Sequence, residues 1–207
     1  QSDDQQQADM DSFAIKARIF DDDGDAESVE FQVNQNPQGR QSGPEVTLLD
    51  NGDFLVIWSS NDAVPANLLA TEIKGRIFDD EGTAVSSEFQ INNISNGLQE
   101  NAEATALGNG SFVVIWSSPD GTQDDTDGTA IKARIFDNDG TPEGNEFVVN
   151  EVTLGFQEDP AVTLLNNGNF VVTWSGEDPD ALGSDYNTYA RIFDSDGDAV
   201  SDEFLVN

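Results

Sequence analysis

Residues 54–58 read F-L-V-I-W, and this stretch decides the class of fold. Side chains alternate between the two faces of an extended strand, so phenylalanine, valine and tryptophan share one face while leucine and isoleucine share the other. Both faces are apolar, and both must therefore be covered by other parts of the protein. Just upstream, residues 45–49 read E-V-T-L-L and are joined to this stretch across Asn51-Gly52, the dipeptide most typical of a tight β-hairpin.

The same hairpin recurs along the chain at an almost constant step. The string R-I-F-D begins four times, at spacings of 58, 58 and 57 residues, and three other landmarks keep this step. The landmarks are Arg18, Arg76, Arg134 and Arg191; Trp58, Trp116 and Trp174; Asn51, Asn109 and Asn167; and Glu30, Glu88, Glu146 and Glu203. We divide the chain into a polar N-terminal segment, 1–12, and one β-repeat domain, 13–207, with units 13–70, 71–128, 129–185 and a partial unit 186–207.

Each unit contains four predicted strands, which in the first unit are residues 15–20, 30–34, 45–49 and 54–58. No stretch repeats at the helical period. Sheets that are apolar on both faces suit radially stacked blades, so we predict an all-β fold, a β-propeller-like array of four-stranded antiparallel repeats in about three and a half copies. A stacked β-sandwich and a wide β-solenoid are the alternatives.

The first two strands of the unit occur four times but the last two only three times, which gives 14 predicted strands rather than 16. A closed four-bladed ring would therefore lack half a blade. Because an unpaired strand edge invites strand addition, other copies of the chain or neighbouring repeats are predicted partners.

The charge of the chain narrows the possible partners. Eight Lys and Arg set against 41 Asp and Glu give a formal net charge of −33, which excludes nucleic acid and anionic membrane surfaces. No apolar run approaches the length that spans a bilayer, so we expect no membrane insertion. Cys and His are absent, so a bound metal should be a hard, oxygen-preferring cation such as Ca²⁺.

The turn after the first strand of each unit is the candidate calcium site. In the last unit it places carboxylates at relative positions 1, 3, 5 and 9 around a glycine, a pattern that resembles the calcium loops of FG-GAP, integrin-like propeller repeats. The predicted ligands are Asp194, Asp196, Asp198 and Asp202, then Asp21, Asp23 and Asp25, then Asp137 and Asp139. The alternative is a solvated turn, because hairpins use Asp and Gly in any case.

Acidic residues also gather after the last strand of each unit, where the loops vary most and could recognise a ligand. They are Asp62; Asp120, Asp124, Asp125 and Asp127; and Glu177, Asp178, Asp180 and Asp185. The alternative is a solvated run of charge.

Seven of the eight cations lie in the first strand of a unit: Lys16, Arg18, Lys74, Arg76, Lys132, Arg134 and Arg191. We predict a repeated ion pair between each Arg and the Glu of the next strand or the Asp of the turn, the alternative being a row of Arg that binds a polyanion. The three Trp are expected in the core rather than stacked on sugars, because each ends an apolar strand at the same repeat position.

The unit resembles the repeats of very large secreted proteins of marine bacteria, which often accompany repeats-in-toxin calcium modules. The pattern R-x-F-D-x-x-G-x-x-x-x-x-E-F-x-V-N is carried by residues 134–150, and P-x-V-x-x-L-x-x-G-x-F-V-V-x-W-x-S by residues 160–175. The resemblance implies type I export, a secreted, cell-surface or matrix location and a role in adhesion. The glycine-rich nonapeptide of the repeats-in-toxin β-roll is absent.

These observations lead us to predict an extracellular, calcium-stabilised structural or adhesive module that is not an enzyme. With 41 acidic residues in the chain, a pair of carboxylates says little about glycoside hydrolysis. The alternative is a carbohydrate-binding, lectin-like propeller that recognises surface glycans through the loops after the last strand. A halophile's solvating surface would explain the charge equally well.

Overall fold

The computed structural model describes residues 14–62, 70–93, 97–119, 128–177 and 186–207. Within them the protein is all-β, with 14 strands and no helix, as the repeat predicts. Nothing in this part of the chain has the length and apolar character of a membrane-crossing helix.

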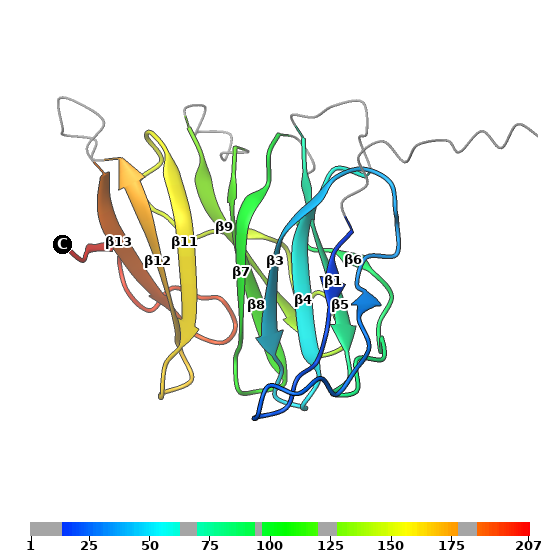
Figure 1. The fold of residues 1–207 in the computed structure, drawn as a ribbon. Helices are drawn as coiled ribbons and strands as arrows, with labels where there is room; N and C mark the ends of the chain where they lie inside the picture. The colour runs from blue at the N-terminus through cyan, green and yellow to red at the C-terminus, as the bar shows by residue number, and fades with distance from the viewer. Residues whose placement is uncertain (1–13, 63–69, 94–96, 120–127, 178–185) are drawn as a thin grey trace, which may run out of the picture.

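The strands form three four-stranded antiparallel sheets and one two-stranded sheet (Figure 1). The two-stranded sheet contains β1 (Lys16–Ala17) and β2 (Phe31–Gln32). The first full sheet contains β3 (Gln41–Leu48), β4 (Phe54–Ser60), β5 (Glu72–Phe78) and β6 (Phe89–Gln90). The second contains β7 (Glu100–Ala106), β8 (Ser111–Ser118), β9 (Ala130–Asp137) and β10 (Phe147–Val148), and the third β11 (Gln157–Leu164), β12 (Phe170–Glu177), β13 (Tyr186–Phe193) and β14 (Phe204–Leu205).

Each full sheet is a blade whose strands pair in chain order. The blade takes its first hairpin from one sequence unit and its second hairpin from the next, so blade and sequence unit are half a repeat out of phase. Neighbouring blades meet along their first strands, β3, β7 and β11, which we call the inner strands. Thr47 Oγ1 in β3, for example, donates a 2.9 Å hydrogen bond to the carbonyl oxygen of Ala104 in β7.

The hairpins that join the first two strands of each blade have the predicted Asn-Gly tips. The glycines adopt positive φ angles of 92° at Gly52, 95° at Gly110 and 87° at Gly168, a backbone region that glycine enters without steric cost. Behind each tip the two strands pair in antiparallel register, so the hairpin prediction is confirmed.

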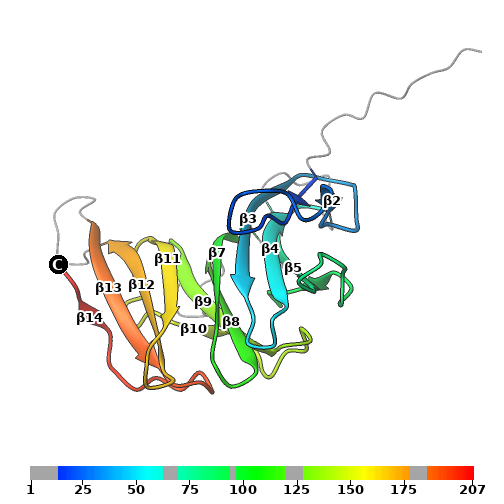
Figure 2. The same cartoon turned by 60° about the horizontal axis from the view of Figure 1, so that its bottom comes forward.

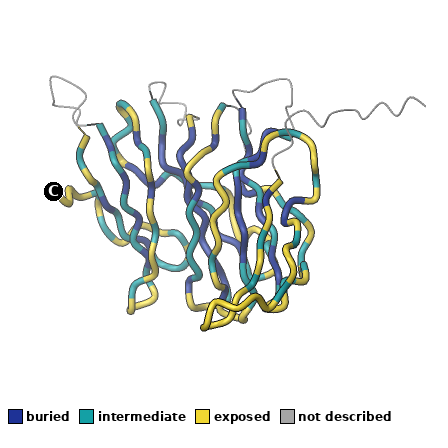
Figure 3. Tube along the Cα trace, in the orientation of Figure 1, coloured by how far each residue is buried: buried dark blue, intermediate teal, exposed yellow. Residues whose placement is uncertain are grey.

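The core lies between the blades, because each sheet is apolar on both faces. Leu55 and Ile57 of the first blade pack with Phe112 and Trp116 of the second in one buried cluster. Buried positions follow the middle of the strands, whereas the connecting turns are exposed (Figure 3). The three Trp are 0%, 0% and 1% exposed in chain order, which confirms that they belong to the core.

The repeated cations make contacts within a sheet and between neighbouring sheets. Within a sheet, Lys16 and Lys132 pair with Glu30 and Glu146 at 2.5 and 3.0 Å. The prediction for arginine is wrong, because a guanidinium Nη1 instead donates to a main-chain carbonyl oxygen of the preceding sheet. The bonds run from Arg76 to Val33 at 2.8 Å, from Arg134 to Ile91 at 2.8 Å and from Arg191 to Val149 at 3.0 Å.

The sheets follow one another along a curved row, with the two-stranded sheet at one end and the third blade at the other (Figure 2). The described residues do not close into a ring. Each end of the row therefore presents a sheet that has a neighbour on one side only.

Candidate functional site

The inner strands carry most of the acidic side chains that lie near one another across blades. Glu45 of β3 and Glu103 of β7 occupy the same repeat position, and so do Glu100 of β7 and Glu158 of β11. Asp159 follows Glu158, and the inner strands contain no Lys or Arg. Three neighbouring strands thus bring five carboxylates to the inner edge of the protein.

A β-bulge interrupts each inner strand beside these carboxylates. At the bulge the backbone enters the left-handed region, with φ of 60° at Gly43, 53° at Asn101 and 50° at Asp159. Side chains other than glycine are strained there, and such strain often accompanies functional sites. Asn101 Nδ2 donates a 3.1 Å hydrogen bond to Asp159 Oδ1, so the two strained residues also connect the second blade to the third.

Two hollows open beside the bulges. One, of about 490 Å³, lies between the first and second blades, and the other, of about 400 Å³, lies between the second and third blades. Both are lined by Leu98, Glu100 and Asn101. Glu158 lines the second hollow, so the two hollows form one polar surface that runs across three blades.

Buried hydrogen bonds fix the inner strands at this surface. The indole Nε1 of Trp116 donates to Gln99 Oε1 at 3.0 Å, and the Trp58–Gln41 and Trp174–Gln157 pairs repeat this bond at 2.8 and 3.0 Å. Thr71 Oγ1 donates to the carbonyl oxygen of Gln99 at 2.8 Å. The backbone just before each bulge is therefore rigid, as a preorganised site requires.

Glu103 differs electrostatically from the other inner-strand carboxyls. Burial raises the pKa of Glu103, and the neighbouring Glu45 raises it further because two like charges oppose each other. A carboxyl with a raised pKa keeps its proton to higher pH and can act as an acid beside a second carboxylate. Glu45 and Glu103 together therefore form a candidate acid–carboxylate pair.

Two exposed aromatic side chains flank the third blade at the same end. Phe156 is 44% exposed and Tyr186 is 43% exposed, although each is a large ring. The main-chain nitrogen of Glu177 donates to the carbonyl oxygen of Phe156 at 3.0 Å, and Glu177 pairs with Tyr186 across β12 and β13. Desolvation, together with Glu158 and Glu177, raises the pKa of the Tyr186 phenol. Exposed rings beside carboxylates suit contact with a sugar.

The predicted calcium ligands lie at the end of the blades opposite the bulges. In the first blade the turn follows Phe78, which pairs with Phe54 at the start of β4. The bulge of β3 lies beside the other end of β4. In every unit the first Asp of the turn orders the backbone. Asp21 Oδ1 accepts hydrogen bonds from the main-chain nitrogens of Asp23 and Asp25, at 3.1 and 2.8 Å. Asp137 and Asp194 make the equivalent bonds, with Asp139 and Thr141 and with Asp196 and Asp198.

The same two bonds form in the second unit, where Asp79 accepts from Glu81 and Thr83 at 3.1 and 2.7 Å although the acidic pattern is lost. The turn therefore needs its first Asp whether or not a cation is bound. Among the described residues no group of three or more acidic side chains is arranged to hold a metal ion, and Asp202 is exposed near the end of the last turn. Calcium binding stays a prediction.

The loops after the last strand of each unit, which were predicted to recognise a ligand, fall largely outside the described residues. Asp120, Asp124, Asp125, Asp127, Asp178, Asp180 and Asp185 all lie there. Of the others, Asp62 accepts a 2.8 Å hydrogen bond from Asn36 Nδ2 and lies 3.6 Å from Lys74 Nζ, so it is part of the blade structure. Glu177 lies beside Phe156 and Tyr186 at the end of the third blade.

Sequence reasoning missed the inner-strand carboxylates. A signal was present, because Glu45 and Glu103 are 58 residues apart, as are Glu100 and Glu158. Among 41 acidic residues this spacing did not stand out, since position in the sequence does not reveal which strand lies at the inner edge.

No protein-family model and no curated protein matches the chain. Solved structures do resemble it. An endo-arabinase from Bacteroides thetaiotaomicron VPI-5482 superposes with a TM-score of 0.56 at 15% identity, over 86% of this chain and 66% of its own. An α-L-arabinofuranosidase from Fusarium graminearum, in complex with an iminosugar inhibitor, gives 0.58 at 14% identity, over 87% and 54%. A Penicillium chrysogenum α-L-arabinanase complexed with arabinobiose gives 0.54 at 19% identity, over 85% and 54%.

These likenesses establish a β-propeller-like fold, and the chain spans between about half and two thirds of the length of these enzymes. They also contradict the prediction of a non-catalytic structural or adhesive module and the prediction that the protein is not an enzyme. The adhesive role rested on the resemblance to repeats of secreted proteins, and the absence of an enzyme rested on how little a pair of carboxylates means among 41 acidic residues. The solved proteins that share this fold are instead named as enzymes that act on arabinose-containing sugars.

Proposed function

We propose that the protein is a carbohydrate-active enzyme that hydrolyses arabinose-containing glycans at its inner-strand edge. One observation carries the proposal: Glu103 has a raised pKa and lies next to Glu45, on adjacent inner strands of a fold shared with arabinan-cleaving enzymes. Glycoside hydrolysis uses two carboxyl groups in different protonation states on either side of the bond that breaks.

In this mechanism the protonated carboxyl of Glu103 gives its proton to the glycosidic oxygen as the bond from that oxygen to the anomeric carbon breaks. The carboxylate of Glu45 stabilises the positive charge that develops on the sugar ring. A water molecule adds its hydroxyl to the anomeric carbon and returns a proton to a carboxylate. The products are two shorter sugars, and both carboxyl groups are restored.

The polar hollows beside the bulges supply the surface on which the chain of sugars would lie. Glu100, Asn101 and Glu158 line it with hydrogen-bonding groups for sugar hydroxyls. Phe156 and Tyr186 offer ring faces at its outer end. A row of polar groups that ends in exposed rings fits an extended, uncharged polymer better than a small charged ligand, because the surrounding field is strongly negative.

The test is release of reducing ends from linear arabinan and from arabino-oligosaccharides by the wild-type protein and by Glu103→Gln. The substitution keeps the shape of the side chain but removes its proton, so the rate should fall by about 100-fold or more. Glu81→Gln, in an exposed turn at the other end of the blades, is the matched control and should leave the rate unchanged. A folded wild-type protein that releases no product, or a Glu103→Gln variant as active as wild type, would refute the proposal.

A further inference from the structure

The two-stranded sheet is half of a blade. Its strands correspond to the third and fourth strands of a full blade, because the R-I-F-D string directly follows β1 and the same string stands at the ends of β5, β9 and β13. Those three strands are seven or eight residues long and pair on both sides, whereas β1 is two residues long and pairs only with β2. Within the part of the chain that the structure describes, the outer edge of β1 therefore has no strand partner and could accept one.

A missing side-chain partner marks the same edge. In each full blade the Phe at the end of the third strand stacks on a Phe of the second strand, at ring-centroid distances of 5.3–5.5 Å. Those third-strand rings are at most 2% exposed. The equivalent residue of the half-blade, Phe20, is 56% exposed. The additional exposed surface of Phe20 is the surface that a Phe on a second strand would cover.

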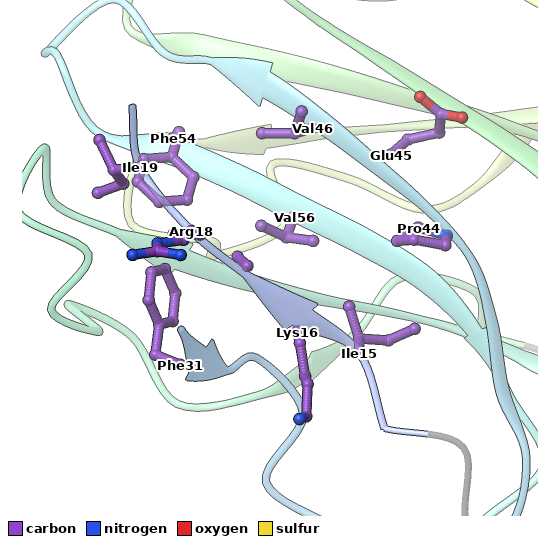
Figure 4. A pocket seen from close by; sticks show the side chains of 11 residues that line it. Ile15, Lys16, Arg18, Ile19, Phe31, Pro44, Glu45, Val46, Phe54 and Val56 are labelled. Carbon is purple, nitrogen blue, oxygen red and sulfur yellow. The ribbon is translucent and has the colours of Figure 1, made fainter. Parts of the chain in front are cut away.

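An apolar groove lies where the first two strands of this blade would run. It has a volume of about 370 Å³ and lies between the half-blade and the first full blade. Figure 4 shows Ile15 and Phe31 on the side of the half-blade, and Val46, Phe54 and Val56 on the side of β3 and β4. Lys16, Arg18 and Glu45 also line the groove, and the carboxylate of Glu45 points away from the apolar side chains in the same view.

The other blades show what should fill the groove. Phe112 and Phe170, the counterparts of Phe54, are 0% exposed because the inner hairpin of the preceding blade packs on them. Between the first and second blades that hairpin supplies Leu49, Leu55 and Ile57. On the first blade, Val46 is 67% exposed and Phe54 is only half buried, because no such hairpin precedes it in the described residues.

We propose that the half-blade binds a β-hairpin of the inner-strand type from a separate polypeptide segment. The hairpin would add two antiparallel strands to the free edge of β1. Its apolar residues at the positions of Leu49, Leu55 and Ile57 would fill the groove, and its second-strand Phe would stack on Phe20. The contact continues an interface that the protein already makes between its own blades.

A synthetic peptide of residues 99–118, which carries the inner hairpin of the second blade, is a suitable probe. Labelled with a fluorophore and titrated with the whole protein, it should raise the anisotropy with one-to-one stoichiometry. A control peptide with Val113→Asp and Ile115→Asp should bind at least tenfold more weakly, because those two positions face the groove. On the protein, Val46→Asp should weaken binding by a similar factor, whereas Val85→Asp, exposed in a turn outside the groove, should not.

Hydrogen exchange gives a second readout. The amides of Lys16, Arg18 and Phe20 should exchange more slowly when the peptide is bound, because they face the outer edge and gain strand partners. Ile15 and Ile19 already donate from their amides to Asn34 and Ser28, so they serve as internal controls. Equal binding of the two peptides, unchanged binding to the Val46→Asp protein, or unchanged exchange at Lys16, Arg18 and Phe20 would overturn the proposal. Self-association of the protein without peptide that Val46→Asp abolishes would also overturn it, since a second copy would then be the occupant.

Discussion

Arg134 and Arg18 occupy the same repeat position, so the effect of replacing each on stability can be compared within one chain. Arg134 donates from Nη1 to the Ile91 carbonyl oxygen at 2.8 Å and from Nε to the Gly144 carbonyl oxygen at 3.0 Å, and its guanidinium lies 5.3 Å from the ring centroid of Phe136. Arg18 sits at the same repeat position and makes the equivalent Nε bond, to Ser28 at 3.0 Å. The described residues contain no sheet before the half-blade to accept its Nη1.

We predict that Arg134→Gln lowers the free energy of unfolding by about 3–5 kcal/mol. The charged hydrogen bond to the preceding blade contributes about 1.5–3 kcal/mol, the second bond about 1 kcal/mol and the contact with the ring about 0.5–1 kcal/mol. Arg18→Gln loses only an exposed bond and an exposed ring contact, so its cost should be about 1 kcal/mol or less.

Urea denaturation followed by fluorescence of the three buried Trp measures both values under the same conditions. The difference between the two variants, about 2–4 kcal/mol, comes mainly from the bond between blades. Equal losses for the two variants would refute the reasoning, because the bond between blades would then contribute nothing.

Three further predictions concern the site and the turns. The folded protein holds a proton on Glu103 that the unfolded chain gives up, so the free energy of unfolding should fall as pH rises through the raised pKa, and Glu103→Gln should flatten that part of a urea-denaturation pH profile. Phe156→Ala and Tyr186→Ala should each weaken binding of linear arabinan in affinity electrophoresis about tenfold while the far-ultraviolet circular dichroism stays unchanged, a retained affinity counting against the ring contact. Asp79→Ala should cost about 1–2 kcal/mol in urea melts with chelator and with calcium alike, and a loss confined to calcium buffer would show that a cation dominates this turn.

Much of the fold could be predicted from sequence because the repeat is local and strong. The 58-residue step gives the number of strands, and Asn51-Gly52 gives the position of the first tight hairpin. The boundary of the blade could not be predicted. Strand pairing between one unit and the next depends on contacts far apart in the chain, so the half-repeat offset became visible only in the sheets.

The candidate site was harder to predict for a related physical reason. The raised pKa of Glu103 arises from burial and from Glu45, which is 58 residues away in sequence and becomes a neighbour only when two inner strands meet. The acidic turns, by contrast, were prominent in sequence. Their first Asp, as in Asp79, bonds to the backbone of its own turn, which accounts for an Asp at that position of every unit.

In a repeat protein, an apolar residue that is exposed in one unit and buried in the others indicates a missing neighbour. Phe20 and Val46 are exposed because they occupy repeat positions whose partners come from a neighbouring hairpin. The counterparts of Phe20 in the full blades, Phe78, Phe136 and Phe193, are at most 2% exposed.

The central claim is that sugars bind along the inner strands. Amide chemical shifts recorded by nuclear magnetic resonance during titration with arabino-oligosaccharides test it most directly. We predict that Glu100, Asn101, Glu103 and Glu158 shift together and saturably, while the turns after β5 and β9 stay unchanged. Saturable shifts confined to those turns, or no shifts at millimolar oligosaccharide, would contradict the account.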